Sequence, residues 1–207
     1  MENLEIPTRL SDEFVTVKAL LDTKGETRGL DALILSWVKY EKQFRRLFSF
    51  LVYQHEWVTA KERKAIDDAI IGNDRLYPYS LTASIQRIGG RPISELVGEP
   101  HDGLAEDIKR IGDYRDKIMH GQLSGDSISR AQLIGDAQIL IDWIKLLGDG
   151  AEKIHGYDGV ERDTFCLARE RPRLDRGGYQ YETLEVLTAW IREINKLKKR
   201  RGNPVEC

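Results

Sequence analysis

The chain has 207 residues, of which 41% are hydrophobic and 32% are charged, and its formal net charge is -2. This length is enough for one domain with a sizeable core and an appended element, and the composition is typical of a soluble globular protein. The small net charge neither indicates nor excludes nucleic-acid binding, because a local basic face can exist on a nearly neutral protein.

The sequence has no apolar N-terminal run typical of a signal peptide and no stretch of 18 apolar residues that would span a membrane. Its two cysteines, Cys166 and Cys207, are too few for a disulfide framework, and no neighbouring histidine or cysteine suggests zinc. We therefore expect a cytoplasmic protein that has no membrane contact, no metal site and no cofactor.

Apolar residues at helical spacing, separated by capping and turn signals, predict an all-α protein. Ser11 is expected as the N-cap of the first helix. The longest pattern predicts a second helix from about Leu30 to His55. Thr59 and Glu62 form a capping box, which predicts a third helix that ends at Gly72.

The segment from residue 73 to residue 100 interrupts the long helices and is rich in turn signals. A short helix near Ser80 to Ile88 and a helical turn opened by Pro92 are expected within it. Asp102 is then expected to cap a helix that reaches His120.

After this helix, Ser129 and Gln132 offer another capping box. An apolar stripe follows from Leu133 to Leu147 and is weakened at Gly148 and Gly150. Two long helices and several shorter ones predict a bundle.

We expect two parts in the chain: a helical bundle over residues 1–156 and an extension over residues 157–207. The extension reads as a basic irregular segment followed by a helix from about Thr183 to Lys199 that packs on the bundle. No convincing strand pattern occurs, although Val160 to Cys166 or Tyr179 to Tyr181 could form short strands.

The stretch from Asp102 to Leu123 carries the most specific signal in the chain. Its apolar residues recur at spacings of three, four and seven, the spacing of one helix face, and are Leu104, Ile108, Ile111, Ile118 and Met119. Arg115 lies on the same face, where an unpaired guanidinium would be costly to bury. His120 follows, and Gly121 is a natural residue for the turn after a helix. An arginine and a histidine near one helix end can handle a phosphate group.

The octapeptide YRDKIMHG, residues 114–121, resembles the signature of the HEPN superfamily. That signature is an arginine, usually followed by a polar residue, and then a histidine four to six residues on. Arg115, Asp116 and His120 match it, with four positions between the arginine and the histidine. The context is also similar, because the motif closes an amphipathic helix, a glycine follows and a long helical segment comes next. The resemblance implies a HEPN-like helical bundle, with a layout that covers about residues 10 to 156.

The chemistry of these residues suits RNA cleavage. An imidazole at His120, placed beside a ribose 2′-hydroxyl, can take its proton, and the alkoxide then attacks the adjacent phosphorus. A guanidinium at Arg115 can hold the charge that builds on the phosphorane oxygens. The products would be a 2′,3′-cyclic phosphate and a 5′-hydroxyl, with no metal needed, and DNA would not react because it lacks the 2′-hydroxyl. Asp116, four residues before His120, could accept a hydrogen bond from the imidazole and set its tautomer.

The resemblance also implies a setting for this chemistry. HEPN ribonucleases dimerise so that two motifs face each other across a cleft, so we expect a homodimer with RNA as its substrate. A toxin–antitoxin pair or host defence is the implied biological role, with an antitoxin or regulatory protein as a further partner. In some HEPN toxins a partner nucleotidyltransferase modifies a tyrosine three residues after the histidine. Leu123 stands at that position here, so this mode of control is not expected.

Two other interpretations stay open. In a structural interpretation, Arg115 pairs with an acid such as Asp113, Asp107 or Glu106, and His120 is a helix-terminal histidine favoured by the helix dipole. In the other, the chain is a non-catalytic HEPN-like module that binds a partner protein, nucleotide or RNA. An ideal helix also sets residues five apart about 140° from each other. The motif arginine and histidine therefore converge only if the helix unwinds at its end or if they meet across a dimer.

Basic residues in the motif helix and in the C-terminal part of the chain could contact RNA phosphates. The candidates are Lys117, Arg169, Arg171, Lys198 and Lys199. A solvated charged face is the alternative for these residues. The apolar stripe of the final helix, with Trp190 beside it, favours core packing, and a partner-helix interface is its alternative.

Overall fold

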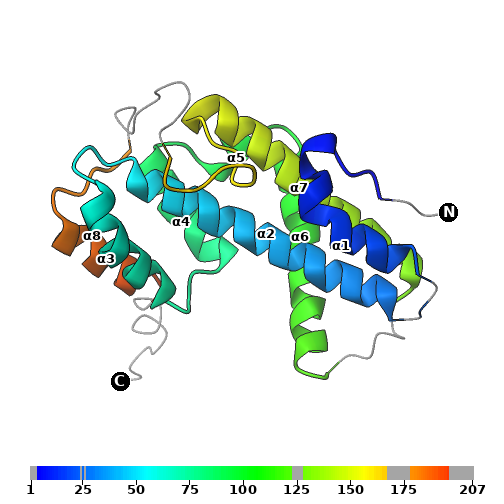
Figure 1. Cartoon of the computed structure of the whole chain (residues 1–207). Helices are drawn as coiled ribbons and strands as arrows, with labels where there is room; N and C mark the ends of the chain where they lie inside the picture. Colours follow the sequence, from blue (N-terminus) through cyan, green and yellow to red (C-terminus); the bar gives the residue numbers. More distant parts are fainter. Residues whose placement is uncertain (1–3, 24, 26, 123–127, 167–177, 196–207) are drawn as a thin grey trace, which may run out of the picture. The chain divides into compact units, whose positions relative to one another are not determined.

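The structure is a computed structural model that describes residues 4–23, 25, 27–122, 128–166 and 178–195. Helices make up 71% of these residues, and no strand occurs among them (Figure 1). The all-α class is therefore confirmed. The two segments that could have formed short strands, Val160–Cys166 and Tyr179–Tyr181, are irregular.

The chain forms two compact units, and each is built from two separate stretches of sequence. The first unit comprises Met1–Gln43 and Ser94–Gly150, and the second comprises Phe44–Ile93 and Ala151–Cys207. The divisions fall within the two longest helices, α2 (Arg28–Tyr53) and α7 (Arg130–His155), and at the start of α5 (Ile93–Val97). The expected boundary after residue 156, between a bundle and an extension, stays a prediction.

The first unit contains α1 (Ser11–Leu21), α6 (His101–Met119), the N-terminal part of α2 (Arg28–Tyr53) and most of α7 (Arg130–His155). The short η1 (Thr8–Leu10) precedes α1. The buried apolar side chains of the first unit come from all of these helices and include Leu10, Phe14, Val17, Leu33, Trp37, Ile111, Leu140 and Ile144.

Helix α2 makes side-chain contacts with each of the other long helices of this unit. Glu13 of α1 forms ion pairs with Lys39 and Lys42 of α2. The side-chain amide of Gln43 donates to the Ile144 carbonyl of α7 at 2.8 Å. Helix α6 contacts α2 through the site described below. These contacts make α2 the element against which the motif helix is held.

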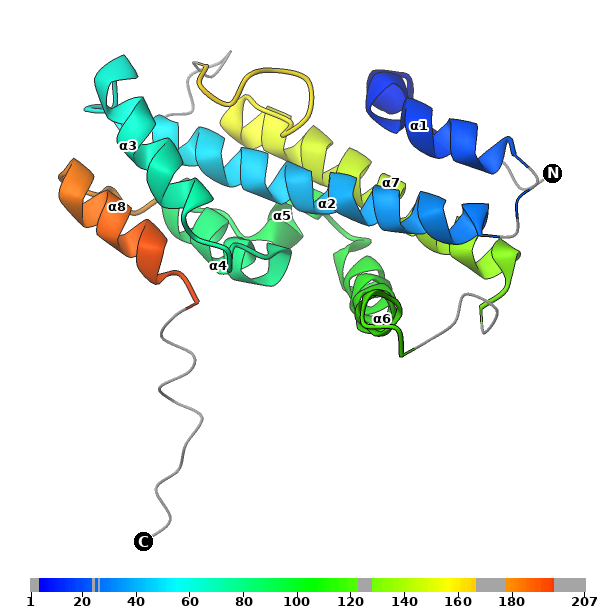
Figure 2. The ribbon, with the colours of Figure 1, turned by 60° about the horizontal axis from the view of Figure 1, so that its bottom comes forward.

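The second unit contains α3 (Ala60–Ile71), α4 (Pro78–Gly89) and α8 (Leu184–Glu193), with the remaining parts of α2 and α7. Helices α3 and α8 pack against each other, and Figure 2 shows them side by side. Buried apolar side chains of this unit include Phe48, Phe50, Ile66, Leu81, Ile88, Tyr157, Leu187 and Ile191.

Helix α8 is shorter than the sequence pattern predicts. It ends at Glu193 because Ile194 has an extended ψ of 124° and Asn195 adopts a left-handed φ of 68°. Lys199, the predicted end, lies outside the described residues. Leu187, Ile191 and Ile194 are buried, which favours core packing for the apolar stripe of this helix.

Two of the predicted N-caps are wrong. Ser11 lies inside α1, because η1 precedes it, and its hydroxyl donates to the Thr8 carbonyl at 2.7 Å. Asp102 lies inside α6, whose N-cap is Pro100, and a carboxylate oxygen of Asp102 lies 2.7 Å from Nδ1 of His101.

The two predicted capping boxes differ in outcome. The Thr59–Glu62 box is complete at the start of α3, as predicted. The second box is half formed, because the Gln132 backbone N–H donates to the Ser129 hydroxyl at 3.1 Å. The side chain of Gln132 donates instead to Asp136 at 2.9 Å. The carboxylate of Asp136 is fully buried and requires hydrogen-bond donors. The side-chain amide of Gln132 is one of them, so it does not complete the capping box.

Helix α7 continues through Gly148 and Gly150, where the pattern is weakened, and ends only at His155. A Cβ atom added at Gly150 would lie 1.8 Å from the carbonyl oxygen of Leu96, close to the end of α5 (Ile93–Val97). The absence of a side chain therefore lets two backbones of the first unit approach each other closely.

Gly150→Ala is expected to lower the free energy of unfolding by about 2 kcal/mol or more, because backbone atoms must move to admit the methyl group. Gly135→Ala is the matched control in the same helix, since nothing lies within 4 Å of its added Cβ. It should raise stability by about 0.5 to 1 kcal/mol through the better helix propensity of alanine. Urea denaturation followed by circular dichroism measures both, and equal effects of the two variants would contradict the close approach.

The imidazole of His55 is buried in the second unit and only 2% exposed. Burial disfavours its charged form and lowers the pKa of His55 below its ordinary value, while the hydrogen bond between Nδ1 and the Val52 carbonyl acts in the opposite direction. Protonating the imidazole therefore costs more in the folded protein than in the unfolded chain.

This lowered pKa predicts a pH-dependent stability. The unfolded chain binds a proton at His55 near its ordinary value of 6.5, whereas the folded chain binds it only at lower pH. The stability that this residue contributes is complete above about pH 6.5 and is lost as the pH falls toward the folded pKa. Urea denaturation at about pH 7.5 and about pH 5 should show a smaller loss for His55→Leu than for the wild type. An equal loss would assign the pH dependence to other groups.

Candidate functional site

The motif residues lie in the last turns of α6, in the first unit. The apolar face of this helix is buried at Ile108 and Ile111, but Ile118 is half-buried and Met119 is exposed. Leu104, the first residue of the apolar stripe, is also half-buried, so the stripe is fully buried only in its middle. Figure 1 shows the last turns of α6 extending past the ribbon of α2. The motif therefore occupies an accessible helix end.

A Schellman motif closes α6 where the sequence predicts the turn. The N–H of Gly121 donates to the Ile118 carbonyl at 3.0 Å, and the N–H of Gln122 donates to the Lys117 carbonyl at 2.8 Å. Gly121 has a φ of 67°, which favours glycine and confirms its predicted place. His120 is the C-cap, with φ of -93° and ψ of 7°, and its side chain is exposed.

The guanidinium of Arg115 is held by three neighbours, which together with Arg115 we call the arginine cluster: Trp37, Glu41 and Asp116. Nη2 donates to Oε1 of Glu41 at 2.9 Å, and Nη1 donates to Oδ1 of Asp116 at 2.5 Å. The guanidinium carbon lies 5.1 Å from the ring centroid of Trp37. Oε1 of Glu41 also accepts a hydrogen bond from the indole N–H of Trp37 at 2.7 Å. The arginine on the apolar face is thus paired, and its side chain is 26% exposed.

The acids suggested by the structural interpretation are not the partners of Arg115. Asp107 pairs with Arg110, and no ion pair joins Arg115 to Asp113 or Glu106 among the described residues. The distant partner is Glu41, which lies 74 positions earlier in the sequence. Helix-periodicity arguments consider neighbours on the same helix and cannot find such a pair.

Trp37, Glu41 and Gly112 belong to the candidate site and were not predicted from the sequence. A Cβ added at Gly112 would lie 2.9 Å from Cη2 of Trp37, so this glycine lets the indole lie against α6. The signal that could have found them is an i, i+4 tryptophan–glutamate pair on one amphipathic helix and a glycine within the motif helix.

The imidazole of His120 is exposed, and no hydrogen bond or ion pair of its side chain occurs within the described part of the chain. The carboxylate of Asp116 is bonded to Arg115, and only the backbone carbonyl of Asp116 accepts from the His120 backbone N–H, at 3.1 Å. The structure thus brings Arg115 and Asp116 together but does not join either side chain to His120. The helix does end at Met119, as convergence of the two motif side chains requires.

A polar network next to the motif fixes α6 against α7. The buried carboxylate of Asp136 accepts hydrogen bonds from Arg110 at 2.8 Å, from the hydroxyl of Tyr114 and from Gln132 at 2.9 Å. Burial raises the pKa of Asp136, and the hydrogen bond from Arg110 opposes this shift. Tyr114 directly precedes the motif arginine, so the network sets the position of the backbone that carries it.

Only one of the five basic residues predicted to contact RNA lies in the described part of the chain. Lys117 is exposed in the last turn of α6, close in sequence to the motif histidine. Arg169, Arg171, Lys198 and Lys199 lie outside the described residues.

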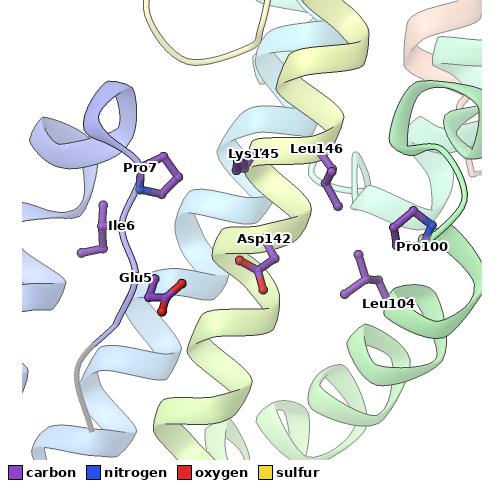
Figure 3. A pocket seen from close by; sticks show the side chains of 8 residues that line it. All are labelled: Glu5, Ile6, Pro7, Pro100, Leu104, Asp142, Lys145 and Leu146. Atoms are coloured by element: carbon purple, nitrogen blue, oxygen red, sulfur yellow. The ribbon is translucent and has the colours of Figure 1, made fainter. Parts of the chain in front are cut away.

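A pocket of about 620 Å³ opens elsewhere in the first unit, between the N-terminal segment, the start of α6 and α7 (Figure 3). It is lined by Glu5, Ile6, Pro7, Pro100, Leu104, Asp142, Lys145 and Leu146. Arg115 follows Leu104 by eleven positions, roughly 16 Å along the helix axis. Neither Arg115 nor His120 lines the pocket, and two acids against one lysine give it no positive surface for a phosphate.

The described residues were also compared with the requirements of a metal site and of a membrane-spanning helix. Within the described ranges, no three histidine, cysteine, aspartate or glutamate side chains gather into a group that could hold a metal ion. None of the helices described here is both long and apolar enough to cross a membrane.

The arginine cluster predicts measurable coupling between Glu41 and Arg115. Glu41→Gln keeps an acceptor for the Trp37 indole but removes the charge, and Arg115→Met keeps the aliphatic stem. A double-mutant cycle of these changes should give a coupling free energy of about 1 kcal/mol, because Glu41 and Arg115 are only 22% and 26% exposed. Each variant should remain folded, because the charged residue left without its partner, Glu41 or Arg115, is partly exposed and can be hydrated.

The matched control is Asp116→Asn, because Asp116 is largely exposed and its pair with Arg115 is open to solvent. Its effect on the free energy of unfolding should be below about 0.5 kcal/mol. Chemical denaturation measures the whole set. An unfolded Arg115→Met variant would instead support a purely structural role for the arginine.

Comparisons of the chain with protein-family models, with curated proteins and with solved structures give no match. The resemblance to the HEPN signature therefore depends on Arg115, Asp116 and His120 and on their place at the end of α6.

Proposed function

We propose that this chain is a metal-independent endoribonuclease of HEPN type, with His120 as the acid–base group and Arg115 as the phosphate anchor. One observation carries the proposal: the Schellman turn presents an exposed imidazole directly after the helix end that carries a fixed guanidinium. The imidazole makes no side-chain hydrogen bond within the described residues, so it is available to a ligand.

In this proposal the imidazole of His120 takes the proton of a ribose 2′-hydroxyl, and the resulting alkoxide forms a bond to the adjacent phosphorus. The bond from phosphorus to the 5′-oxygen breaks, and that oxygen takes a proton from an acid. The products are a 2′,3′-cyclic phosphate and a 5′-hydroxyl. A 2′-hydroxyl supplies the nucleophile, so DNA is not a substrate.

The arginine cluster leaves Arg115 able to contact a phosphate. A guanidinium has five N–H donors, and the ion pairs to Glu41 and Asp116 engage one on each terminal nitrogen. The remaining donors can bind phosphate oxygens as negative charge builds on them. Because the carboxylates and the Trp37 ring fix the guanidinium, little of its conformational freedom remains to be lost on binding.

One copy of the motif supplies one histidine and one arginine, so the proposal includes a homodimer. A second His120 facing the first could donate the proton to the leaving 5′-oxygen. Asp116 is proposed to orient the imidazole when RNA is bound, and Lys117 to contact a phosphate from the same helix turn. A role as a toxin or defence effector, controlled by an antitoxin or regulatory protein, belongs to the same proposal.

A non-catalytic module that binds a partner protein, nucleotide or RNA is the second candidate. The two carboxylates beside Arg115 favour it, because they offset the positive charge that would attract a phosphate. The arginine then serves to hold α6 on α2, and the exposed helix end serves as a contact surface.

Cleavage of a labelled single-stranded RNA in excess EDTA tests the first candidate. The wild type should yield 2′,3′-cyclic phosphate and 5′-hydroxyl ends and should leave a DNA of the same sequence whole. His120→Ala should lower the rate by about 100-fold or more, as expected for loss of a general acid–base group. Arg115→Ala should lower it by about 100- to 1000-fold, as expected for loss of a transition-state donor.

The matched control is His101→Ala, which removes a histidine from the other end of α6 and should leave the rate unchanged. Circular dichroism confirms that each variant is folded. If a folded, dimeric wild type leaves RNA whole, or if His120→Ala cleaves at the wild-type rate, the ribonuclease proposal fails and the binding module is favoured.

A further inference from the structure

The second unit carries a pocket that has no part in the motif chemistry. It has a volume of about 850 Å³ and is formed by α4, the end of α8 and the segment around residue 179. Its lining includes Tyr79 and Arg87 of α4, together with Tyr179, Trp190 and Asn195 from the later part of the chain. Serines of α4 and Gln86 add hydrogen-bonding groups to the lining.

Two of the tyrosines that line this pocket are largely exposed to solvent. Tyr79 is 61% exposed and Tyr179 is 50% exposed, which is unusual for such large side chains. The ring of Tyr77 lies nearly parallel to that of Tyr79, at 10° and with centroids 6.0 Å apart. Tyr179 packs edge-on against the buried Tyr181 at 4.8 Å. Each of these two exposed tyrosines is therefore supported by a neighbouring ring.

The guanidinium of Arg87 lies among the aromatic rings. Its carbon is 4.4 Å from the ring centroid of Tyr179, 5.5 Å from that of Tyr181 and 5.8 Å from that of Trp190. The backbone N–H of Tyr179 donates to the Arg87 carbonyl at 2.7 Å, which ties the two residues together. Within the described residues Arg87 forms no ion pair, although Glu193 also lines the pocket. This leaves a fixed cation next to exposed aromatic faces.

We propose that this pocket binds the unpaired bases of single-stranded RNA. Unpaired bases stack on tyrosine rings and on arginine planes, and such stacking tolerates any base because every base has a π-face. A guanidinium beside the stacking rings meets the phosphate that links the bases. A base pair within a duplex hides these faces, so the pocket discriminates against double strands.

The charge of the neighbouring sequence favours a polyanion over an uncharged partner. Four arginines and two acids occur between residues 169 and 176, just before Gly178, and five basic residues and no acid occur between residues 196 and 201, just after Asn195. Gly178 and Asn195 both line the pocket. Both segments lie outside the described residues. The inference concerns binding alone and does not depend on cleavage at His120.

The test is equilibrium binding of a fluorescein-labelled, 2′-O-methylated 12-nucleotide strand to the full chain, followed by fluorescence anisotropy. Such a strand cannot be cleaved through a 2′-hydroxyl, so the result is independent of any ribonuclease activity. Tyr79→Ala and Tyr179→Ala should each weaken binding about fivefold or more, which is the lower range for loss of one stacked base. Arg87→Gln should weaken binding and reduce its salt dependence.

Tyr79→Phe and Tyr179→Phe keep the rings and should bind like the wild type. Ile71→Ala is the surface control, because Ile71 is highly exposed but does not line the pocket. The same strand annealed to its complement should bind more weakly than the single strand. Absence of single-strand binding, equal binding by the folded alanine variants, or equal affinity for the duplex would each overturn the inference.

Discussion

The ion pair between Glu41 and Arg115 is the interaction on which the candidate site depends. It joins α2 to the last turns of α6, and the indole of Trp37 supports both partners from one side. Without a partner, an arginine on the apolar face of α6 would oppose the packing of that helix. The same contact therefore permits the motif helix to pack and determines where its guanidinium points.

The two motif side chains are under different physical constraints. Arg115 is anchored by charge and by an aromatic ring, whereas His120 is an exposed helix cap whose following position favours glycine. A phosphate anchor benefits from such rigidity, and a proton-transfer group benefits from access to its substrate. The carboxylates that position the arginine also weaken its attraction for anions, so the proposed activity depends on donors that the ion pairs leave open.

The second unit contributes a different kind of surface. Its pocket combines exposed tyrosine rings with an arginine that has no ion-pair partner in the described part of the chain, whereas the motif combines an arginine and a histidine. Stacking and proton transfer require different side chains, so the two surfaces make independent proposals about RNA. The aromatic residues come from α4 and from the segment before α8, which are separated by about ninety positions in the sequence.

Features that depend only on neighbouring residues could be predicted from the sequence. The helical class, the Thr59–Glu62 box and the glycine turn at Gly121 were predictable because capping and periodicity act within a few positions. The partner of Arg115 was not predictable, because Glu41 reaches it only after α2 and α6 have packed. The end of α8 and the tyrosine pocket depend in the same way on tertiary contacts. Local free energies select the helices, and packing between distant residues decides which side chains meet.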